Sequence, residues 1–428
     1  MLRQPSMQDL SGALAGAARS IATAIAGGGS RAWIVGGAPR DLALALAPAE
    51  IDIASAATPD VIESLFRGTI PLGRAFGTVI VRVDGVDVQH TTFRSEGTYA
   101  DARRPDAVAF GRTVEEDSSR RDFTCNAIYL DPLDGTVADP QGGLADLASR
   151  RLRCVGEASA RFREDGLRLL RMARFAAALD LEPDAATLAA ARSSSEALRG
   201  VSPERVLEEL SRIFTRAGSL RAVSLLADLD LLARAIPGLG TKAEAEGGRE
   251  RWWEARRGVL ASLPAIPGLA LGLAALLDSV DELRPSHALR KRIVAIRELA
   301  QESSAALAGP RSRRVRWMRE DAFAESAALA KARAIATGAT GAEASRIDAA
   351  VREREELGAD GLSPPRLISS KDLEESGVPK GRRWGELLRE AEDRQLDGKF
   401  DSRAAALAWL AARAKEARQE GGKTPRSA

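Results

Sequence analysis

Residues 33–41 read WIVGGAPRD, and residues 50–55 read EIDIAS. In the first segment a run of apolar residues leads to Gly36 and Gly37, directly before an expected helix start at Pro39. Glycines before a helix N-terminus let the backbone approach a phosphate closely and direct unpaired N–H groups toward it. The segment therefore predicts a strand, a phosphate-binding turn and a helix. Taken alone, it fits a tight strand-to-helix turn without a ligand equally well.

The second segment carries two carboxylates at alternate positions. Glu50 and Asp52 lie two residues apart, so a strand here would place both side chains on one face and leave Ile51 and Ile53 for the core. Two carboxylates on one face repel each other unless cations lie between them. A pair of Mg²⁺ ions, which prefer oxygen ligands and substrate phosphates, suits this arrangement. The alternative is the solvated polar face of an edge strand.

The rest of the first third of the chain alternates short strands with turns. An amphipathic helix is expected over about residues 8–25, before a run of glycines. The pair Asp84-Gly85 supplies the positive φ values that a two-residue hairpin turn needs. We therefore expect residues 77–83 and 86–93 to pair as antiparallel strands within a mixed α/β domain.

Residues 119–131, SRRDFTCNAIYLD, form a third group of polar side chains. Arg120 and Arg121 stand beside Asp122, and Asn126 is expected on the strand that follows. Forked guanidinium donors next to a carboxylate acceptor suit the recognition of a phosphate or a ribose. Ordinary surface ion pairing explains this cluster equally well when it is taken alone.

Residues 163–175, REDGLRLLRMARF, predict a helix with Asp165 and Arg168 three residues apart and with Arg171 and Arg174 continuing the same face. Such a pair would read the Watson–Crick edge of C or A, because the carboxylate accepts from the exocyclic amine and the guanidinium donates to the neighbouring ring acceptor. U and G present mismatched groups there. For the isolated motif, an ion pair worth about 0.2–0.5 kcal/mol is the simpler alternative.

The chain beyond Ser159 shows no strand signals, and apolar residues recur at spacings of three and four, which predicts helices. With 62 Lys and Arg against 60 Asp and Glu, the net charge is +2. This balance excludes nucleic-acid binding through bulk charge and leaves only local patches. The densest basic run, GPRSRRVRWMRE at 309–320, would contact RNA phosphates or form a solvated helix face.

Cysteine and histidine are scarce, with two of each. Cys125 and Cys154 match no metal-binding spacing and cannot build a disulfide framework, so a reducing cytoplasm is the expected location. His90 and His287 cannot form a clustered histidine site, so any metal must bind carboxylates. No apolar run reaches the roughly 18 residues that a spanning helix needs, so no membrane association is expected.

Taken in order, these motifs resemble those of the class II tRNA nucleotidyltransferases, the family of CCA-adding enzymes and bacterial poly(A) polymerases. GGAPRD, EIDIASAATPD, SRRDFTCNA and EDGLRLLRMARF are similar to the family's GGxVRD, DxDIATxATPE, RRDFTxNA and EDxxRxxRxxRF. VSPERVLEEL and, near the C-terminus, DLEESGVPKGRRWGELL and QLDGKF also look like family segments. Ordered agreement over six segments is far more specific than any single motif.

The resemblance implies an α+β fold with a polymerase β-like nucleotidyltransferase head followed by an all-α neck, body and tail. The expected bounds are 1–155 for the head, 156–235 for a nucleotide-selecting, RNA-binding neck, 236–345 for the body and 346–428 for a tRNA-binding tail with a disordered C-terminus. The implied reaction is template-independent transfer of CMP and AMP from CTP and ATP to the 3′-hydroxyl of tRNA, with release of pyrophosphate.

The resemblance also assigns roles to the polar residues. Glu50 and Asp52 would be the catalytic carboxylates and would hold two Mg²⁺ ions. The nucleotide would be bound by Gly36, Gly37 and Arg40 at the phosphates, by Arg120 and Asp122 near the sugar, by Asp165 with Arg168 at the base, and further by Asn126, Arg171 and Arg174.

Two positions depart from the family pattern. Glu50 stands where the family has its first metal-binding Asp, and Gln89 stands two residues before TTFR, where the family often has Glu. Asp87, on the same strand face as Gln89, either supplies the missing charge or is an exposed residue of the hairpin. We expect the backbone around Glu50 to have adjusted to the longer side chain, because the other motifs keep the residues that the chemistry needs.

Three alternatives stay open at this point. Residues 91–110, TTFRSEGTYADARRPDAVAF, resemble the loop that accompanies addition of the terminal A, which disfavours a CC-only enzyme but leaves an A-adding enzyme possible. A poly(A) polymerase is disfavoured because QLDGKF resembles the tRNA-specific members. A catalytically impaired RNA-binding paralogue is motivated by Glu50 and Gln89. A small-molecule nucleotidyltransferase would not need the long helical remainder.

Overall fold

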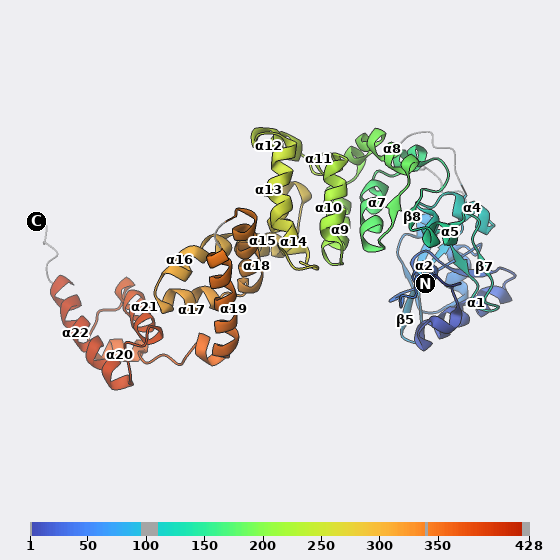
Figure 1. Cartoon of the computed structure of the whole chain (residues 1–428). Helices are drawn as coiled ribbons and strands as arrows, with labels where there is room; N and C mark the ends of the chain where they lie inside the picture. Colours follow the sequence, from blue (N-terminus) through green and yellow to red (C-terminus); the bar gives the residue numbers. More distant parts are fainter. Residues whose placement is uncertain (1, 96–109, 339–340, 422–428) are drawn as a thin grey trace, which may run out of the picture. The chain divides into compact units, whose positions relative to one another are not determined.

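The computed structural model describes residues 2–95, 110–338 and 341–421 (Figure 1). Its contacts divide the chain into two compact units, Met1–Glu246 and Gly247–Ala428. A mixed sheet lies in the first unit and helices make up the described part of the second, so the expected α+β head and helical remainder are confirmed. The finer division into head, neck, body and tail stays a prediction.

The first unit contains the strands of the chain's described part and the helices α1 to α12. The strands are β1 (Ala32–Val35), β2 (Asp52–Ser55), β3 (Thr69–Pro71), β4 (Thr78–Val83), β5 (Val86–Thr92), β6 (Tyr129–Leu130), β7 (Val137–Ala138), β8 (Arg151–Leu152) and β9 (Glu182–Pro183). The helices are α1 (Gly12–Gly27), α2 (Gly37–Ala43), α3 (Pro59–Leu65), α4 (Val114–Ser119), α5 (Gly143–Ala148), α6 (Ala158–Glu164), α7 (Leu167–Ala178), α8 (Ala185–Ser193), α9 (Pro203–Phe214), α10 (Ser219–Asp228), α11 (Leu231–Ala235) and α12 (Leu239–Ala245), with 3-10 turns η1 (Met7–Asp9), η2 (Arg74–Phe76), η3 (Thr124–Asn126) and η4 (Ser195–Gly200).

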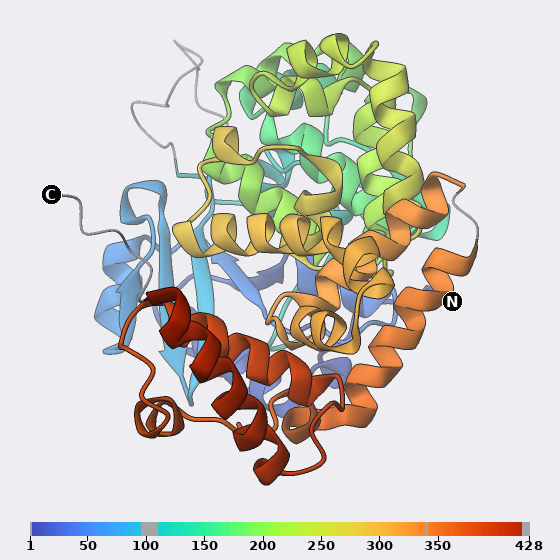
Figure 2. The same cartoon turned by 90° about the vertical axis from the view of Figure 1, so that its left-hand side faces the viewer.

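The main sheet has the strand order β3-β4-β5-β2-β1-β6-β7. β2 runs parallel to β5 and antiparallel to β1, and the remaining neighbours are antiparallel. Figure 2 shows the β4–β5 hairpin in light blue. Its turn residues Asp84 and Gly85 have φ values of 52° and 79°, which confirms the predicted hairpin.

The two faces of the sheet have different coverings. Ile21 and Ile25 of α1 pack against Ile34 and Ile53 in the larger apolar core. Ala54 belongs to a separate cluster that also includes residues of β1 and β6. Since strand side chains alternate between faces, the carboxylate two residues before Ala54 lies on the face opposite α1. This face carries the candidate site.

Two local expectations are adjusted by the structure. The N-terminal helix begins at Gly12 rather than near residue 8, because Ser11 caps it by accepting from the Leu14 N–H, and residues 7–9 form η1. Among the described residues beyond Ser159 one short strand occurs: β9 follows α7 and pairs in parallel with β8. This strand was missed by sequence analysis because two residues are too few to show the alternation typical of a strand.

The second unit is helical throughout its described residues. It comprises α13 (Arg249–Ala261), α14 (Leu269–Leu276), η5 (Asp281–Leu283), α15 (His287–Gln301), α16 (Ser303–Ala308), α17 (Arg311–Arg319), α18 (Phe323–Ala336), α19 (Gly341–Leu362), α20 (Ser370–Glu375), α21 (Arg382–Leu396) and α22 (Arg403–Gly421). The last three helices share an apolar core that includes Leu373, Leu387 and Leu410. Residues 422–428, where a disordered end is expected, lie outside the described residues. No described helix is both long enough and apolar enough to cross a membrane.

The basic run at 309–320 forms α17, and several of its arginines are engaged within the second unit. Arg314 Nε lies 2.7 Å from Glu353 of α19. Arg316 and Arg319 both pair with Glu392 of α21, at 3.1 and 2.8 Å. These arginines hold neighbouring helices together, which favours a structural role for them over contact with RNA phosphates.

Candidate active site

Gly36 ends β1 and turns the chain into α2. Its φ of 80° and ψ of −120° suit glycine, and a Cβ at this position would lie 3.8 Å from both Asp52 Oδ2 and Arg121 Nη1. The turn therefore brings a carboxylate and a guanidinium close to the backbone. The predicted strand, turn and helix are confirmed, but the helix begins at Gly37 rather than Pro39. Proline is tolerated in the first helical turn because the N–H groups there have no intrahelical partner.

Asp52 is the first residue of β2, whereas Glu50 precedes the strand, so the expectation that both lie on one strand is wrong. The reason is that Asp52 pairs with Val35, the last residue of β1, after which the chain turns away at Gly36 and leaves Glu50 without a strand partner. The two carboxylates still interact. Burial and the charge of Glu50 raise the pKa of Asp52 to about 6, against the opposing charge of Arg121. The site thus holds excess negative charge.

Gln89 lies beside this carboxylate. In the parallel register of β2 and β5, Gln89 pairs with Asp52. Asp87 instead makes two hydrogen bonds with Arg82 across the hairpin, at 2.6 and 2.8 Å, and its side chain is 48% exposed. The hydrogen bond from Arg82 lowers the pKa of Asp87. Asp87 is therefore an exposed hairpin residue with its charge already paired.

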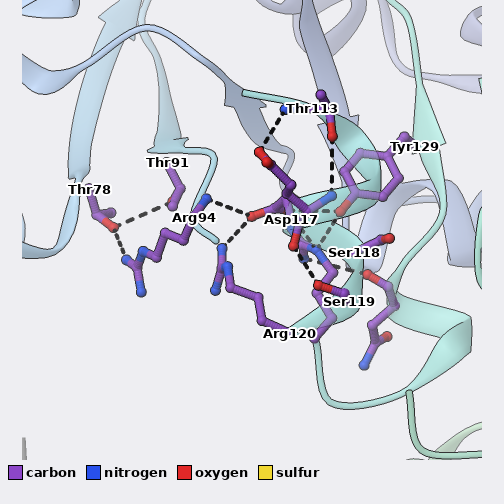
Figure 3. Close-up of polar contacts among 12 residues, drawn as sticks. Thr78, Thr91, Arg94, Thr113, Asp117, Ser118, Ser119, Arg120 and Tyr129 are labelled. Carbon is purple, nitrogen blue, oxygen red and sulfur yellow. Dashed lines mark hydrogen bonds and ion pairs between the residues drawn. The ribbon is translucent and has the colours of Figure 1, made fainter. Parts of the chain in front are cut away.

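Asp117 of α4 is a buried carboxylate that sequence analysis missed (Figure 3). Its Oδ2 accepts from Arg121 Nε and Nη2, at 3.0 and 2.8 Å, and from Tyr129 Oη at 2.8 Å. Its Oδ1 pairs with Arg120 and accepts from the backbone N–H of Arg94 at 3.4 Å. Burial opposes ionisation, but the charges of Arg121 and Arg120 hold the pKa of Asp117 at about 2. The sequence does carry a signal for this carboxylate, because Asp117 lies three and four residues before Arg120 and Arg121.

Arg121 is the second functional candidate that sequence analysis left out of the site. Its guanidinium is fixed by Asp117, and Nη1 lies near the position where Gly36 and Asp52 meet. The side chain also contacts the ring of Tyr129, with its Cζ 5.4 Å from the ring centroid. Arg121 therefore supplies a fixed positive charge beside the acidic pair.

Four of the predicted residues form one continuous hydrogen-bonded chain. Arg40 Nη1 donates to Asn126 Oδ1 at 2.6 Å, and Asn126 Nδ2 donates to Asp122 Oδ1 at 3.1 Å. Arg171 Nε donates to Asp122 Oδ2 at 2.8 Å. Burial alone would raise the pKa of Asp122, but Arg171 and the Asn126 hydrogen bond hold it at about 2. The structure thus brings together residues from three separate motifs.

Asn126 does not lie on a strand, contrary to expectation. It is the last residue of η3, and the strand β6 begins only at Tyr129. Thr124 in this turn packs so closely against Gly143 that no Cβ would fit there, and the Asn126 side chain is held by Arg40 and Asp122. These tertiary contacts override the strand preference of the sequence.

The segment 163–175 is two helices rather than one, so the expected pair on a single helix face is wrong. Asp165 is extended, with φ −149° and ψ 103°, between the end of α6 and the start of α7. Gly166 follows it and packs against the backbone of Ala197 so closely that no side chain would fit. This approach breaks the helix at the point where the sequence pattern continues.

Asp165 and Arg168 consequently have separate partners. Asp165 accepts from Arg205 of α9, at 3.1 and 2.8 Å. Arg168 Nη1 pairs with Glu164 at 2.7 Å, and Nη2 donates to the carbonyl oxygen of Arg120 at 3.0 Å. No ion pair between Asp165 and Arg168 is among the contacts of these described residues, so the simple salt-bridge interpretation of the motif is not supported.

Arg174 is buried and pairs with the buried Glu209 of α9. Its Cζ also lies 4.1 Å from the ring centroid of Phe175. Arg40 is buried as well, at 6% exposure, and is occupied by Asp41 and Asn126. These two buried arginines hold other residues of the site, in contrast to the partly exposed Arg120, Arg121 and Arg171.

Comparisons with known proteins cover this site. Residues 32–153 match the family described as the poly A polymerase head domain, and residues 180–242 match the "Probable RNA and SrmB-binding site of polymerase A". The CCA-adding enzyme of Geobacillus thermodenitrificans is 41% identical over 232 residues, which is 54% of this chain and 57% of that protein. The CCA-adding enzyme of Levilactobacillus brevis is 45% identical over 198 residues, 46% of this chain and 50% of that protein. The matched region thus spans about half the length of these curated relatives.

Solved structures extend the likeness along the chain. The Bacillus stearothermophilus CCA-adding enzyme in complex with CTP has a TM-score of 0.76 at 27% identity, covering 96% of this chain and 100% of that one. The Thermotoga maritima CCA-adding enzyme complexed with tRNA has a TM-score of 0.68, covering 96% and 99%, and at 17% identity it shows the fold alone. The described fold is therefore similar to that of a CCA-adding enzyme, with a head domain similar to that of poly A polymerases. Over about half of its length the chain is similar to CCA-adding enzymes, and its two matched segments resemble parts of poly A polymerases.

Nucleotidyltransferases of this family use a divalent metal ion. Asp52 and Glu50 fit such an ion, because burial and mutual repulsion leave the Asp52 carboxylate without full compensation of its charge. Among the residues that the structure describes, no group of three or more His, Cys, Asp and Glu side chains is arranged for a metal. Asp52 and Glu50 would therefore be the carboxylates that bind the metal ion, with the Gln89 amide beside Asp52.

Proposed function

We propose that this chain adds C and A nucleotides to the 3′ end of tRNA, using CTP and ATP and no nucleic-acid template. The observation that carries the proposal is the acidic pair Glu50 and Asp52 beside the Gly36 turn. Arg121 lies next to Asp52 and Gly36. The names of the curated relatives and the CTP complex of the 27% identical structure support it.

In the proposed reaction, the RNA 3′ oxygen forms a bond to the α-phosphorus of the nucleotide. The bond from this phosphorus to the pyrophosphate breaks, and the hydroxyl proton is released. The backbone at Gly36 and Gly37 binds the phosphates, and Arg121, held by Asp117, adds positive charge beside them. Mg²⁺ is the metal we propose, because oxygen ligands and phosphates suit it, and it would stabilise developing negative charge there.

The remaining predicted residues bind the nucleoside part of the substrate in this proposal. Arg120, Asp122 and Asn126 lie near the sugar, and Arg171 fixes Asp122. Asp165 and Arg168 read the base. Arg40 and Arg174 act on the nucleotide through the partners that they hold, because both guanidinium groups are buried.

Addition of A alone and poly(A) synthesis are the alternatives within the same chemistry. Most of the segment that resembles the A-adding loop, residues 96–109, lies outside the described residues, so the choice of CCA addition rests on the relatives. The impaired-paralogue alternative rests on Glu50 and Gln89. A cytoplasmic location is proposed from the two cysteines, both free thiols and both buried.

One experiment separates these activities. Purified protein is incubated with tRNA ending before CCA, tRNA ending in CC, and mature tRNA, each with CTP, ATP or both and with Mg²⁺, and extension is measured at single-nucleotide resolution. Addition of CCA to the first substrate, A to the second and nothing to the third supports the proposal. Extension of the second substrate alone indicates an A-adding enzyme, and long A tails indicate a poly(A) polymerase. No extension of any substrate indicates the impaired paralogue.

A further inference from the structure

Arg205 makes the closest side-chain contact to the proposed base-reading carboxylate. Its Nη1 and Nη2 lie 3.1 and 2.8 Å from Oδ1 and Oδ2 of Asp165, in a bidentate arrangement. The two residues are 40 positions apart and come from different elements, since Asp165 lies before α7 and Arg205 belongs to α9. α7 and α9 pack against each other. The pair therefore links the two helices at the proposed base site.

The position of Arg205 is not explained by the stability of its own helix. Arg205 lies in the first turn of α9, and its backbone N–H donates to the capping Ser202 Oγ. A positive charge in the first turn is unfavourable there because of the helix dipole. Its side chain is 49% exposed and that of Asp165 is 31% exposed, so this is an ion pair of the kind that contributes little to folding.

The hydrogen bonds of Asp165 leave one acceptor position of its carboxylate open. An ionised carboxylate has about four acceptor positions. Oδ1 accepts from Arg205 Nη1 and, at 3.1 Å, from the Leu167 N–H, whereas Oδ2 accepts only from Arg205 Nη2 among the described contacts. One acceptor position on Oδ2 remains. The exocyclic amine of C or A would fill it, whereas the carbonyl oxygen that U or G presents there is a second acceptor.

We propose that Arg205 is a specificity-determining positioning residue, whose forked guanidinium fixes the plane of the Asp165 carboxylate and leaves one acceptor position for the amine of C or A. This inference rests on the proposed function, because it assigns a base-reading role to Asp165. Without Arg205 the carboxylate keeps only the hydrogen bond from the Leu167 N–H, which does not fix its plane, and the site loses the fixed mismatch by which it rejects a carbonyl. A site with fixed polar groups discriminates strongly, since a wrong base leaves those groups unpaired.

The test measures nucleotide binding without RNA, and tRNA binding by the parent and by Arg205→Ala is measured separately over a range of salt concentrations. Isothermal titration with CTP, ATP, UTP and GTP in Mg²⁺ is performed on the full-length protein, on Arg205→Ala, Arg205→Lys and Asp165→Ala, and on the double variant of the two alanine changes. Arg82→Ala is the matched control, because Arg82 makes a similar two-bond contact with the exposed Asp87 on the β4–β5 hairpin, at 2.6 and 2.8 Å. Thermal unfolding of each variant separates a loss of folding from a loss of selectivity.

We expect Arg205→Ala to reduce the preference for CTP over UTP by at least about tenfold, with an unchanged unfolding temperature. Arg205→Lys should also lose preference, since lysine keeps the charge but lacks the fork. The double variant should be no less selective than Asp165→Ala, and Arg82→Ala should match the parent.

Three results would overturn the inference. The first is an unchanged CTP-to-UTP ratio in Arg205→Ala. The second is a parent protein that binds the four nucleotides equally or binds none. The third is a loss of tRNA affinity and salt dependence in Arg205→Ala without a change in selectivity, which would make Arg205 an RNA phosphate contact. A parent that selects C and A but extends no tRNA refutes the proposed function and still tests this inference.

Discussion

Asp52 lies directly beside Gln89 in the parallel register of β2 and β5. The neighbour of the proposed metal-binding carboxylate is therefore an uncharged amide, and the other negative charge that acts on Asp52 comes from Glu50, just before the strand. Arg121 acts in the opposite direction. The balance among the charges of Asp52, Glu50 and Arg121 determines both the stability of the metal-free site and its affinity for a cation.

The first prediction concerns Asp52→Asn, which should lower nucleotide transfer by at least about a hundredfold and raise the stability of the metal-free protein. Because the pKa of Asp52 is raised to about 6, the unfolded state ionises first as pH increases. Stability is therefore lost between about pH 4 and pH 6, and the loss is complete above pH 6. Removing this charge should raise the free energy of unfolding at pH 8 by about 1–3 kcal/mol.

Urea unfolding in a chelator at pH 5 and pH 8 tests this stability change, and single-turnover tRNA extension tests the activity. If Asp52→Asn destabilises the metal-free protein at pH 8, the Asp52 charge is well compensated. Parental extension by the variant would refute the metal assignment.

A second prediction follows from the register. Gln89→Glu places a third carboxylate beside Asp52 and should increase the affinity for Mg²⁺, so that half-maximal extension needs a lower Mg²⁺ concentration. In the metal-free protein the same change should lower stability, because like charges gather at one site. The matched control is Asp87→Asn, on the same strand, which should leave the Mg²⁺ dependence unchanged since Asp87 is paired with Arg82. An unchanged Mg²⁺ dependence in Gln89→Glu would place residue 89 outside the metal site.

Turn chemistry and order of motifs made much of the first unit predictable. Asp84 and Gly85 specify their hairpin through local backbone preferences, so that prediction is confirmed. Glu50 could not be placed, because the start of β2 depends on where β1 ends, which is a long-range relationship. The break after Asp165 depends on close packing of Gly166 against Ala197, and no local pattern reports that contact.

The candidate site shows the same division between local and long-range information. Residue types that suit phosphate and base recognition were visible in the sequence, but their partners were not. Arg205 and Glu209 reach the site from α9, and Arg121 is held in place by Asp117. Only the last of these pairings has a short sequence spacing that could have been recognised.

The third prediction is that Asp117→Asn destabilises the protein by about 3–5 kcal/mol, since it leaves the guanidinium groups of Arg120 and Arg121 without their buried partner. The pKa of Asp117 is held at about 2, so its contribution is complete above about pH 4 and is lost as pH falls toward 2. The variant should therefore show a weaker loss of stability over this pH range.

Denaturant unfolding from pH 7 to pH 2.5 measures this difference. Asp180→Asn serves as the control, because Asp180 is an exposed partner of Arg150 and Arg221 and should leave the curve nearly unchanged. Parallel pH curves for the parent and Asp117→Asn would contradict the role given to this carboxylate.

The fourth prediction concerns the helices after α19. Removing the chain after Gly361 should weaken tRNA binding and reduce its salt dependence, while CTP binding to the first unit is retained. The truncation also removes Glu392, the partner of Arg316 and Arg319. Glu392→Gln in the full chain is therefore the matched control, since it removes these ion pairs and keeps the tail. Equal affinity and salt slope for the truncated and full-length proteins would show that the tail does not bind tRNA.

The last prediction concerns Glu50, where this chain departs from the family pattern. Mg²⁺ requires near-octahedral geometry with ligands at about 2.0–2.1 Å, so a longer side chain must approach the ion from a more distant backbone. Glu50 has room to do so because it precedes β2 and is not held in the sheet. We therefore expect Glu50→Asp to lower single-turnover AMP and CMP addition, since a displacement of about 1 Å can reduce the rate about a hundredfold. The measurement compares both proteins over a range of Mg²⁺ concentrations, with Glu50→Gln as the control for charge. A faster Glu50→Asp variant would mean that the site has decayed from an ancestral Asp rather than adapted to Glu.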